Sequence, residues 1–134
     1  MGAVEKRSYG VATGILGTLL NAGDVVSVTV TMDEATSVTG TPQLALNIGG
    51  ALVQANYLSG DGTTDLVFTY TILASQTDAD GISIAANSLS LNGGTLQDAA
   101  GNAATLTHDA VTDNSDYLVD TTADAAPGSV NLAT

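Results

Sequence analysis

Apolar and polar residues alternate over much of this chain, and this pattern predicts β-strands. From Val26 to Met32 every second residue is apolar, and the residues between carry hydroxyl groups. A period of two is typical of a strand with one buried face, because successive side chains point to opposite sides. The alternation recurs in residues 43–48, 52–58 and 66–72. The residues expected on the buried faces are Val26, Val28, Val30, Met32, Leu44, Leu46, Ile48, Val53, Ala55, Tyr57, Leu66, Phe68, Tyr70 and Ile72.

Shorter apolar groups and glycine-rich turns complete the pattern. Further short strands are expected at Ile82 and Ile84, at Leu89 and Leu91, near Leu96, near Leu106, and over residues 116–120. Turn residues such as Gly49-Gly50 and Asn92-Gly93-Gly94 separate these segments. No segment keeps the 3.6-residue period of a helix, and residues 85–87 allow a single helical turn at most. About seven short antiparallel strands predict an all-β, immunoglobulin-like β-sandwich with Greek-key connections.

The chain divides into one domain and a short tail. A length of 134 residues suits a single domain with a real core. Residues 1–123 are expected to form the sandwich; residues 1–14 match no clear pattern, and we assign them as a first strand at a sheet edge. Residues 124–134 contain Pro and Gly and are expected to be a linker or the start of a next repeat.

Composition and charge exclude several classes of partner. Fourteen acidic residues and two basic ones give a formal net charge of −12, which argues against nucleic acid and against anionic membrane surfaces. No apolar run approaches the roughly 20 residues that cross a bilayer. The chain has no cysteine, so disulfides and thiolate metal sites are excluded. An acidic surface of this kind either keeps a protein soluble by self-repulsion or collects cations.

Four segments, in order and spacing, carry a resemblance to a known family. They are residues 21–32, 40–47, 89–102 (which includes the turn Asp-Ala-Ala-Gly-Asn) and 117–123 (Tyr-Leu-Val-Asp-Thr-Thr-Ala). Together they resemble the bacterial immunoglobulin-like repeats that stand in tandem in giant secreted adhesins, many of the RTX kind. The resemblance covers residues 14–123 and implies a β-sandwich that extends a stalk at the bacterial surface, often with Ca²⁺ at the junctions between repeats. Two features depart from the family: Asp124 stands where a Pro usually follows, and residues 4–11 match no part of it.

Acidic turns are the candidate metal ligands. Ca²⁺ takes six to eight oxygens from carboxylates, amides and carbonyls. The candidates in this chain are Asp24, Asp61, Asp65, Asp78, Asp80, Asp98, Asn102 and Asp120. None of their segments matches the twelve-residue EF-hand loop, and the alternative is that these residues only cap the backbone of their own turns.

The order of the expected strands divides the acids between the two ends of the sandwich. Asp24, Asp78, Asp80, Asp120 and Asp124 are expected at the end where the domain finishes, and Asp33, Glu34, Asp61, Asp65, Asp98 and Asn102 at the other. Close carboxylates repel one another, and a divalent ion relieves that repulsion. We therefore expect calcium at one or both ends, with ligands from a neighbouring repeat where one domain lacks them.

The candidates for catalysis are weak, so we do not expect an enzyme. His108 is the only histidine and has no evident nucleophile beside it, which favours a surface or loop residue. The carboxylate pairs Asp33/Glu34 and Asp78/Asp80 lack the aromatic residues that usually accompany a sugar site. Lys6 is the only lysine, and an ordinary surface role is favoured over an internal isopeptide bond.

These observations predict a structural spacer repeat of a large adhesin, which projects a distal adhesive region. Its partners are then the neighbouring repeats of the same chain, and an isolated copy is expected to be monomeric. The alternative from the same class of protein is a module that binds a glycan or peptide through the loops at one end. An accessory domain of a secreted enzyme is a third hypothesis.

Overall fold

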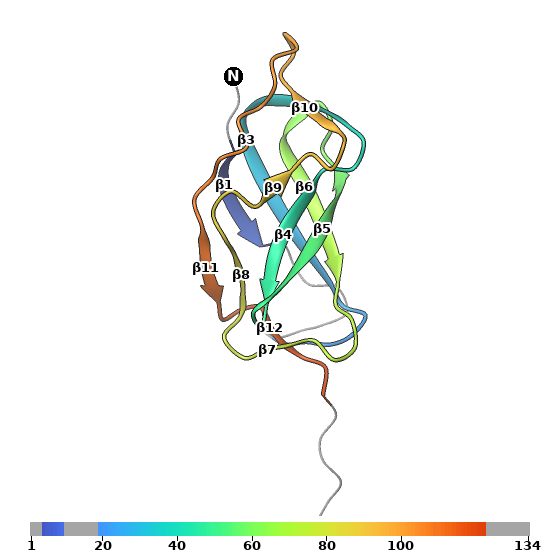
Figure 1. Ribbon diagram of the computed structural model, residues 1–134, viewed down its shortest axis with the longest axis vertical. Helices are drawn as coiled ribbons and strands as arrows, with labels where there is room; N and C mark the ends of the chain where they lie inside the picture. Colours follow the sequence, from blue (N-terminus) through green and yellow to red (C-terminus); the bar gives the residue numbers. More distant parts are fainter. Residues whose placement is uncertain (1–3, 10–18, 123–134) are drawn as a thin grey trace, which may run out of the picture.

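The protein is an all-β sandwich, as the alternating pattern predicts (Figure 1). The computed structural model describes residues 4–9 and 19–122, and none of these residues is helical. The strands are β1 (Val4–Tyr9), β2 (Leu19–Leu20), β3 (Val25–Thr39), β4 (Gln43–Ile48), β5 (Ala51–Ser59), β6 (Thr63–Thr71), β7 (Thr77–Asp78), β8 (Ile82–Ile84), β9 (Leu89–Ser90), β10 (Thr95–Gln97), β11 (Val111–Asn114) and β12 (Leu118–Asp120). Within this part of the chain, no helix exists that is long and apolar enough to cross a membrane.

One long path of paired strands and one small sheet enclose the core. The long path runs β1-β3-β6-β5-β4-β8-β11, with β10 paired to β3 and β9 paired to β4. The small sheet has the order β2-β12-β7. Every pairing is antiparallel except that of β12 with β2, which is parallel. The immunoglobulin-like, Greek-key assignment stays a prediction.

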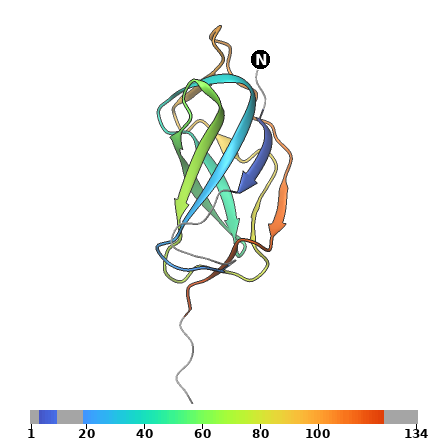
Figure 2. The ribbon, with the colours of Figure 1, turned by 180° about the vertical axis from the view of Figure 1, so that it is seen from behind.

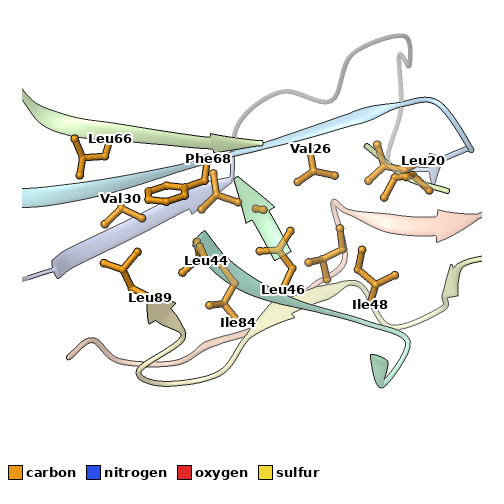
Figure 3. Close-up of a cluster of buried hydrophobic side chains, with 14 of the residues drawn as sticks. Leu20, Val26, Val30, Leu44, Leu46, Ile48, Leu66, Phe68, Ile84 and Leu89 are labelled. Carbon is orange, nitrogen blue, oxygen red and sulfur yellow. The ribbon is translucent and has the colours of Figure 1, made fainter. Parts of the chain in front are cut away.

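The strand register places the predicted apolar faces inside. In the β3–β6 pair, Val28 lies opposite Phe68 and Val30 opposite Leu66, and all four side chains are buried. Figure 3 shows this cluster with side chains from both layers pointing toward one another. The ring of Tyr57 packs edge-on against Phe68, with ring centroids 6.0 Å apart. The core residues are Leu20, Val26, Val28, Val30, Met32, Leu44, Leu46, Ile48, Ala55, Leu66, Phe68, Ile72, Ile82, Ile84, Leu89, Leu96 and Val119, while Val53, Tyr57 and Tyr70 are partly buried.

The sandwich has two distinct ends, which lie at opposite extremes of its long axis (Figures 1 and 2). The β12 end carries β7, β12 and the turn at Gly49-Gly50. The β10 end carries β10, the turn between β5 and β6, and residues 98–102. Gly49 lies so close to β7 that a Cβ atom there would sit 2.0 Å from the carbonyl oxygen of Thr77, so this turn position excludes every other residue.

Several short elements differ from the prediction. The strand expected near Leu106 is wrong: this stretch has isolated bridge residues at Ala103, which pairs with Gln97, and at Thr105, but no strand. The helical turn allowed at residues 85–87 is absent, because Asn87 has a φ of 59° in the left-handed region. The last strand covers three residues rather than five, while β2, β7 and β11 were not predicted. The first edge strand is confirmed as β1, although residues 10–14 lie outside the described part.

Candidate functional site

The predicted ligands are divided between the two ends of the sandwich. The β12 end holds Asp24, Asp78, Asp80 and Asp120, and the β10 end holds Asp33, Glu34, Asp61, Asp65, Asp98 and Asn102. Pairing of β12 with β7 sets Asp120 opposite Thr77 and Val119 opposite Asp78. Asp124 lies outside the described residues.

Asp78 is a buried anchor for two loops at the β12 end. Its side chain is only 6% exposed, which is unusual for an acidic residue. Oδ2 accepts a hydrogen bond from the N–H of Gly49 at 2.9 Å. Oδ1 accepts two more, from the N–H groups of Gly81 at 2.9 Å and Asp80 at 3.1 Å. One carboxylate therefore ties the β4–β5 turn to the loop that follows β7, and backbone donors already occupy both of its oxygens.

Asp98 organises the turn that projects from the β10 end. Its Oδ1 accepts the N–H groups of Asn102 at 2.8 Å and Ala100 at 3.0 Å, and its Oδ2 accepts the Asn102 amide at 3.2 Å. Backbone hydrogen bonds close the same turn. The N–H of Asp98 donates to the carbonyl oxygen of Asn102, and the N–H of Gly101 donates to the carbonyl oxygen of Asp98. The hydrogen bond from the Asn102 backbone is the main reason why the pKa of Asp98 lies below its ordinary value.

Asp24, Asp61, Asp65 and Asp120 accept hydrogen bonds. These bonds run from Asn21 N to Asp24 Oδ2 (2.8 Å), from Val38 N to Asp61 Oδ1 (2.8 Å), from Thr31 Oγ1 to Asp65 Oδ1 (3.3 Å) and from Thr122 N to Asp120 Oδ1 (3.0 Å). The bonds to Asp24 and Asp120 are local caps of their own turns, whereas those to Asp61 and Asp65 come from β3. Across residues 4–9 and 19–122, no group of three or more His, Asp or Glu side chains is arranged to hold a metal ion. The calcium site stays a prediction.

His108 lies in a loop, as expected, but it is not at the surface. The side chain is only 7% exposed. Its Nε2 accepts the N–H of Ser88 at 2.8 Å, and its Nδ1 lies 2.8 Å from the carbonyl oxygen of Asp109, so Nδ1 carries the proton. The N–H of His108 donates to the Asn87 side chain at 3.1 Å. The bonds to Ser88 and Asn87 therefore join the His108 loop to the segment between β8 and β9, which is a structural role.

Two surface hollows lie on the sandwich, and the first of them is bordered by the candidate ligands Asp78 and Asp120. The first, of ≈ 330 Å³, is at the β12 end and is lined by Leu19, Thr77, Asp78, Ala79, Leu118, Val119 and Asp120. The second, of ≈ 320 Å³, is lined by Asn47, Ser83, Ile84, Ala85, Ala110, Val111, Thr112 and Asp113. Neither lining contains an aromatic residue, so neither provides the stacking surface that sugar rings favour. The sequence reasoning missed the first hollow, because two-residue strands such as β2 and β7 have no readable period.

Comparison of this chain with protein-family models, with curated proteins and with solved structures finds no match.

Proposed function

We propose that this domain is a structural spacer, one repeat of a longer rod-like protein at a bacterial surface. The observation that carries the proposal is the placement of the chain's entry and exit. The start of β1 lies opposite Met32, toward the β10 end, whereas β12 closes the described chain at the other end (Figure 1). A domain that is entered at one end and left at the other adds its whole length to a tandem array.

The strand order supports the immunoglobulin-like part of the proposal. The path β1-β3-β6-β5-β4-β8-β11 is continuous, with β5 paired to β4 along its length, and its first four and last three strands follow the immunoglobulin order. Seven-stranded immunoglobulin domains pack a sheet of four strands on a sheet of three in the same chain order. Such domains occur widely as extracellular building units, but a shared fold does not by itself assign a function.

The acidic ends suggest how calcium would act in such an array. When two copies meet end to end, Asp24, Asp80 and Asp120 of one copy approach Asp61 and Asp65 of the next. Hydrogen bonds to both oxygens of Asp78 and Asp98 already engage those two carboxylates, which leaves the carboxylates named above as the proposed ligands. A bound Ca²⁺ supplies positive charge that offsets the repulsion between the two ends. The proposed site is thus shared between copies rather than complete in one.

A ligand-binding module has less support. The described hollows are open and lack aromatic side chains, and Tyr57 and Tyr70 pack against the core. Binding of a glycan or peptide would have to rest on the acidic loops alone. Titration with neutral and acidic glycans, which we expect to show no saturable binding, tests this alternative.

Solution scattering of joined copies tests the spacer proposal. The molecules to compare are the single chain and two full copies joined head to tail, each in excess EDTA, in Ca²⁺ and in Mg²⁺. We expect the pair to have a single extended length near twice that of the single chain, and to be more uniform in Ca²⁺ than in Mg²⁺. A broad distribution of lengths in every condition would overturn the proposal. Melting of the single chain in Ca²⁺ and EDTA separates a site within one copy from a shared one, because a bound ion raises stability by about 2.7 kcal/mol at one hundred times its Kd.

A further inference from the structure

The hollow at the β12 end is built by the outward face of the small sheet. Leu19 of β2 and Leu118 of β12 lie opposite each other in the parallel register, and Leu19 is 47% exposed. Their neighbours Leu20 and Val119 point the other way and are buried. Ala79, after β7, completes the apolar lining. Water therefore covers adjacent apolar side chains at the end from which the chain continues, and burial of such a surface is favourable.

The opposite end of the domain carries a projecting turn with an apolar tip. Figures 1 and 2 show the orange segment after β10 standing clear of the sandwich. Its tip residues Ala99 and Ala100 are exposed. The hydrogen bonds of Asp98 hold this turn in one shape from within. A tip that is ordered before binding loses little conformational entropy when it docks.

We propose that the Ala99–Ala100 tip of one copy seats in the Leu19–Leu118 hollow of the copy that precedes it in the chain. This inference rests on the proposed spacer function and names the contact that joins its repeats. The hollow, of ≈ 330 Å³, is large enough to receive small side chains such as the two methyl groups of the tip.

The position of the chain exit favours a second copy as the occupant. Thr122 follows β12 by two residues and is the last residue described, and residues 123–134 span at most roughly 40 Å. A tether of this length holds whatever follows near the hollow at an effective concentration on the order of millimolar. Because tip and hollow lie at opposite ends, the contact is head to tail and does not close, so it extends into a linear array.

Charge makes the contact depend on the tether. Asp98 at the base of the tip approaches Asp120, and Asp80 follows Ala79 beside the same hollow. These carboxylates would repel one another in the docked pair, and salt reduces the repulsion because the Debye length is about 10 Å at 0.1 M. Separate copies are therefore expected to stay monomeric at low salt, while joined copies dock.

Disulfide trapping in two joined copies tests the contact. The chain contains no cysteine, so each introduced pair reports only on itself. The forward variant carries Leu19→Cys in the first copy and Ala99→Cys in the second. The reversed variant carries Ala99→Cys in the first copy and Leu19→Cys in the second, which places the same two cysteines at the far ends. We expect the forward pair to oxidise faster than the reversed pair by on the order of tenfold or more.

The outcomes separate this contact from the spacer function. Equal oxidation rates for the forward and reversed pairs would overturn the proposed contact. The same holds if the forward disulfide does not form although single copies with Leu19→Cys or Ala99→Cys melt like the parent. If scattering still shows one extended length, the spacer function stands and only the contact is wrong. If the joined copies have no defined length, both proposals fail. A second forward pair, Leu19→Cys in the first copy and Ala100→Cys in the second, leaves position 99 open to substitution. Adding Ala99→Glu to the second copy should slow the oxidation of this pair. The control Ala86→Glu, in an exposed turn between β8 and β9, should not slow it.

Discussion

Removal of the Asp78 carboxylate is the change that most directly tests how the β12 end is built. In Asp78→Ala, the N–H groups of Gly49, Asp80 and Gly81 lose their acceptor. Gly81 is buried, and a buried donor without a partner costs about 1–3 kcal/mol. Gly49 and Asp80 are exposed, so water replaces part of their bonds, at about 0.5–1.5 kcal/mol each. The expected loss in the free energy of unfolding is therefore about 2–6 kcal/mol.

The isosteric change Asp78→Asn should cost less. An amide keeps one acceptor oxygen for the buried Gly81 N–H and turns its NH₂ group toward the exposed Gly49, so we expect a loss of about 1–2 kcal/mol. Urea unfolding measures both variants, with the midpoint lowered and the m-value unchanged. Asp120→Asn at the same end is the matched control, because this exposed side chain accepts one local bond, and it should stay within about 0.5 kcal/mol of the parent.

The same variants decide between an anchor and a metal ligand. A backbone anchor gives equal losses in EDTA and in Ca²⁺, whereas a ligand gives a larger loss in Ca²⁺ because ion binding is removed as well. Asp78→Ala within about 0.5 kcal/mol of the parent, in either solution, would refute the argument from the three hydrogen bonds.

Four further predictions concern single side chains. The pKa of Asp98 is lowered from 3.8. The contribution of this carboxylate to stability is therefore present above pH 3.8 and is lost as the pH falls through the lowered pKa. Asp98→Asn should flatten this part of the curve of melting temperature against pH. Burial, and to a smaller extent the charge of Asp116, raises the pKa of Tyr117 above 10.0. The contribution of Tyr117 to stability is therefore present below pH 10.0 and is lost as the pH rises through the raised pKa. Tyr117→Phe should abolish this alkaline loss of stability in thermal melts. His108→Ala should cost about 1–3 kcal/mol in urea unfolding, because a backbone N–H loses its acceptor, and an unchanged midpoint would contradict this. Gly81→Ala should cost more than Gly93→Ala in the same assay, since both have positive φ but only at Gly81 would a Cβ atom lie 2.0 Å from a backbone oxygen.

The polar groups inside the protein show where sequence reasoning stops. The acids were expected in turns, but Asp65, Asp78 and Asp120 lie in the strands β6, β7 and β12. Nothing in the spacing around Asp78 distinguishes a buried acceptor of three hydrogen bonds from an exposed acid. His108 was expected to be a surface or loop residue; it lies in a loop, and it is buried there with partners for both ring nitrogens, Ser88 from a distant segment and the adjacent Asp109. Burial of a polar side chain depends on such partners, and pairings between distant segments leave no local pattern.

The sequence by itself determined the fold class, the long strands and most of the core. In β3, β4, β5 and β6 the alternation runs for enough residues that only one register puts the apolar face inside. The tertiary structure alone decided the two-residue strands β2 and β7, the hollow that they form with β12, and its placement opposite the projecting turn at Asp98. The physical reason is one of range: periodicity along a strand records which face is buried, whereas the ends of a sandwich are assembled from segments that meet only once the sheets have packed.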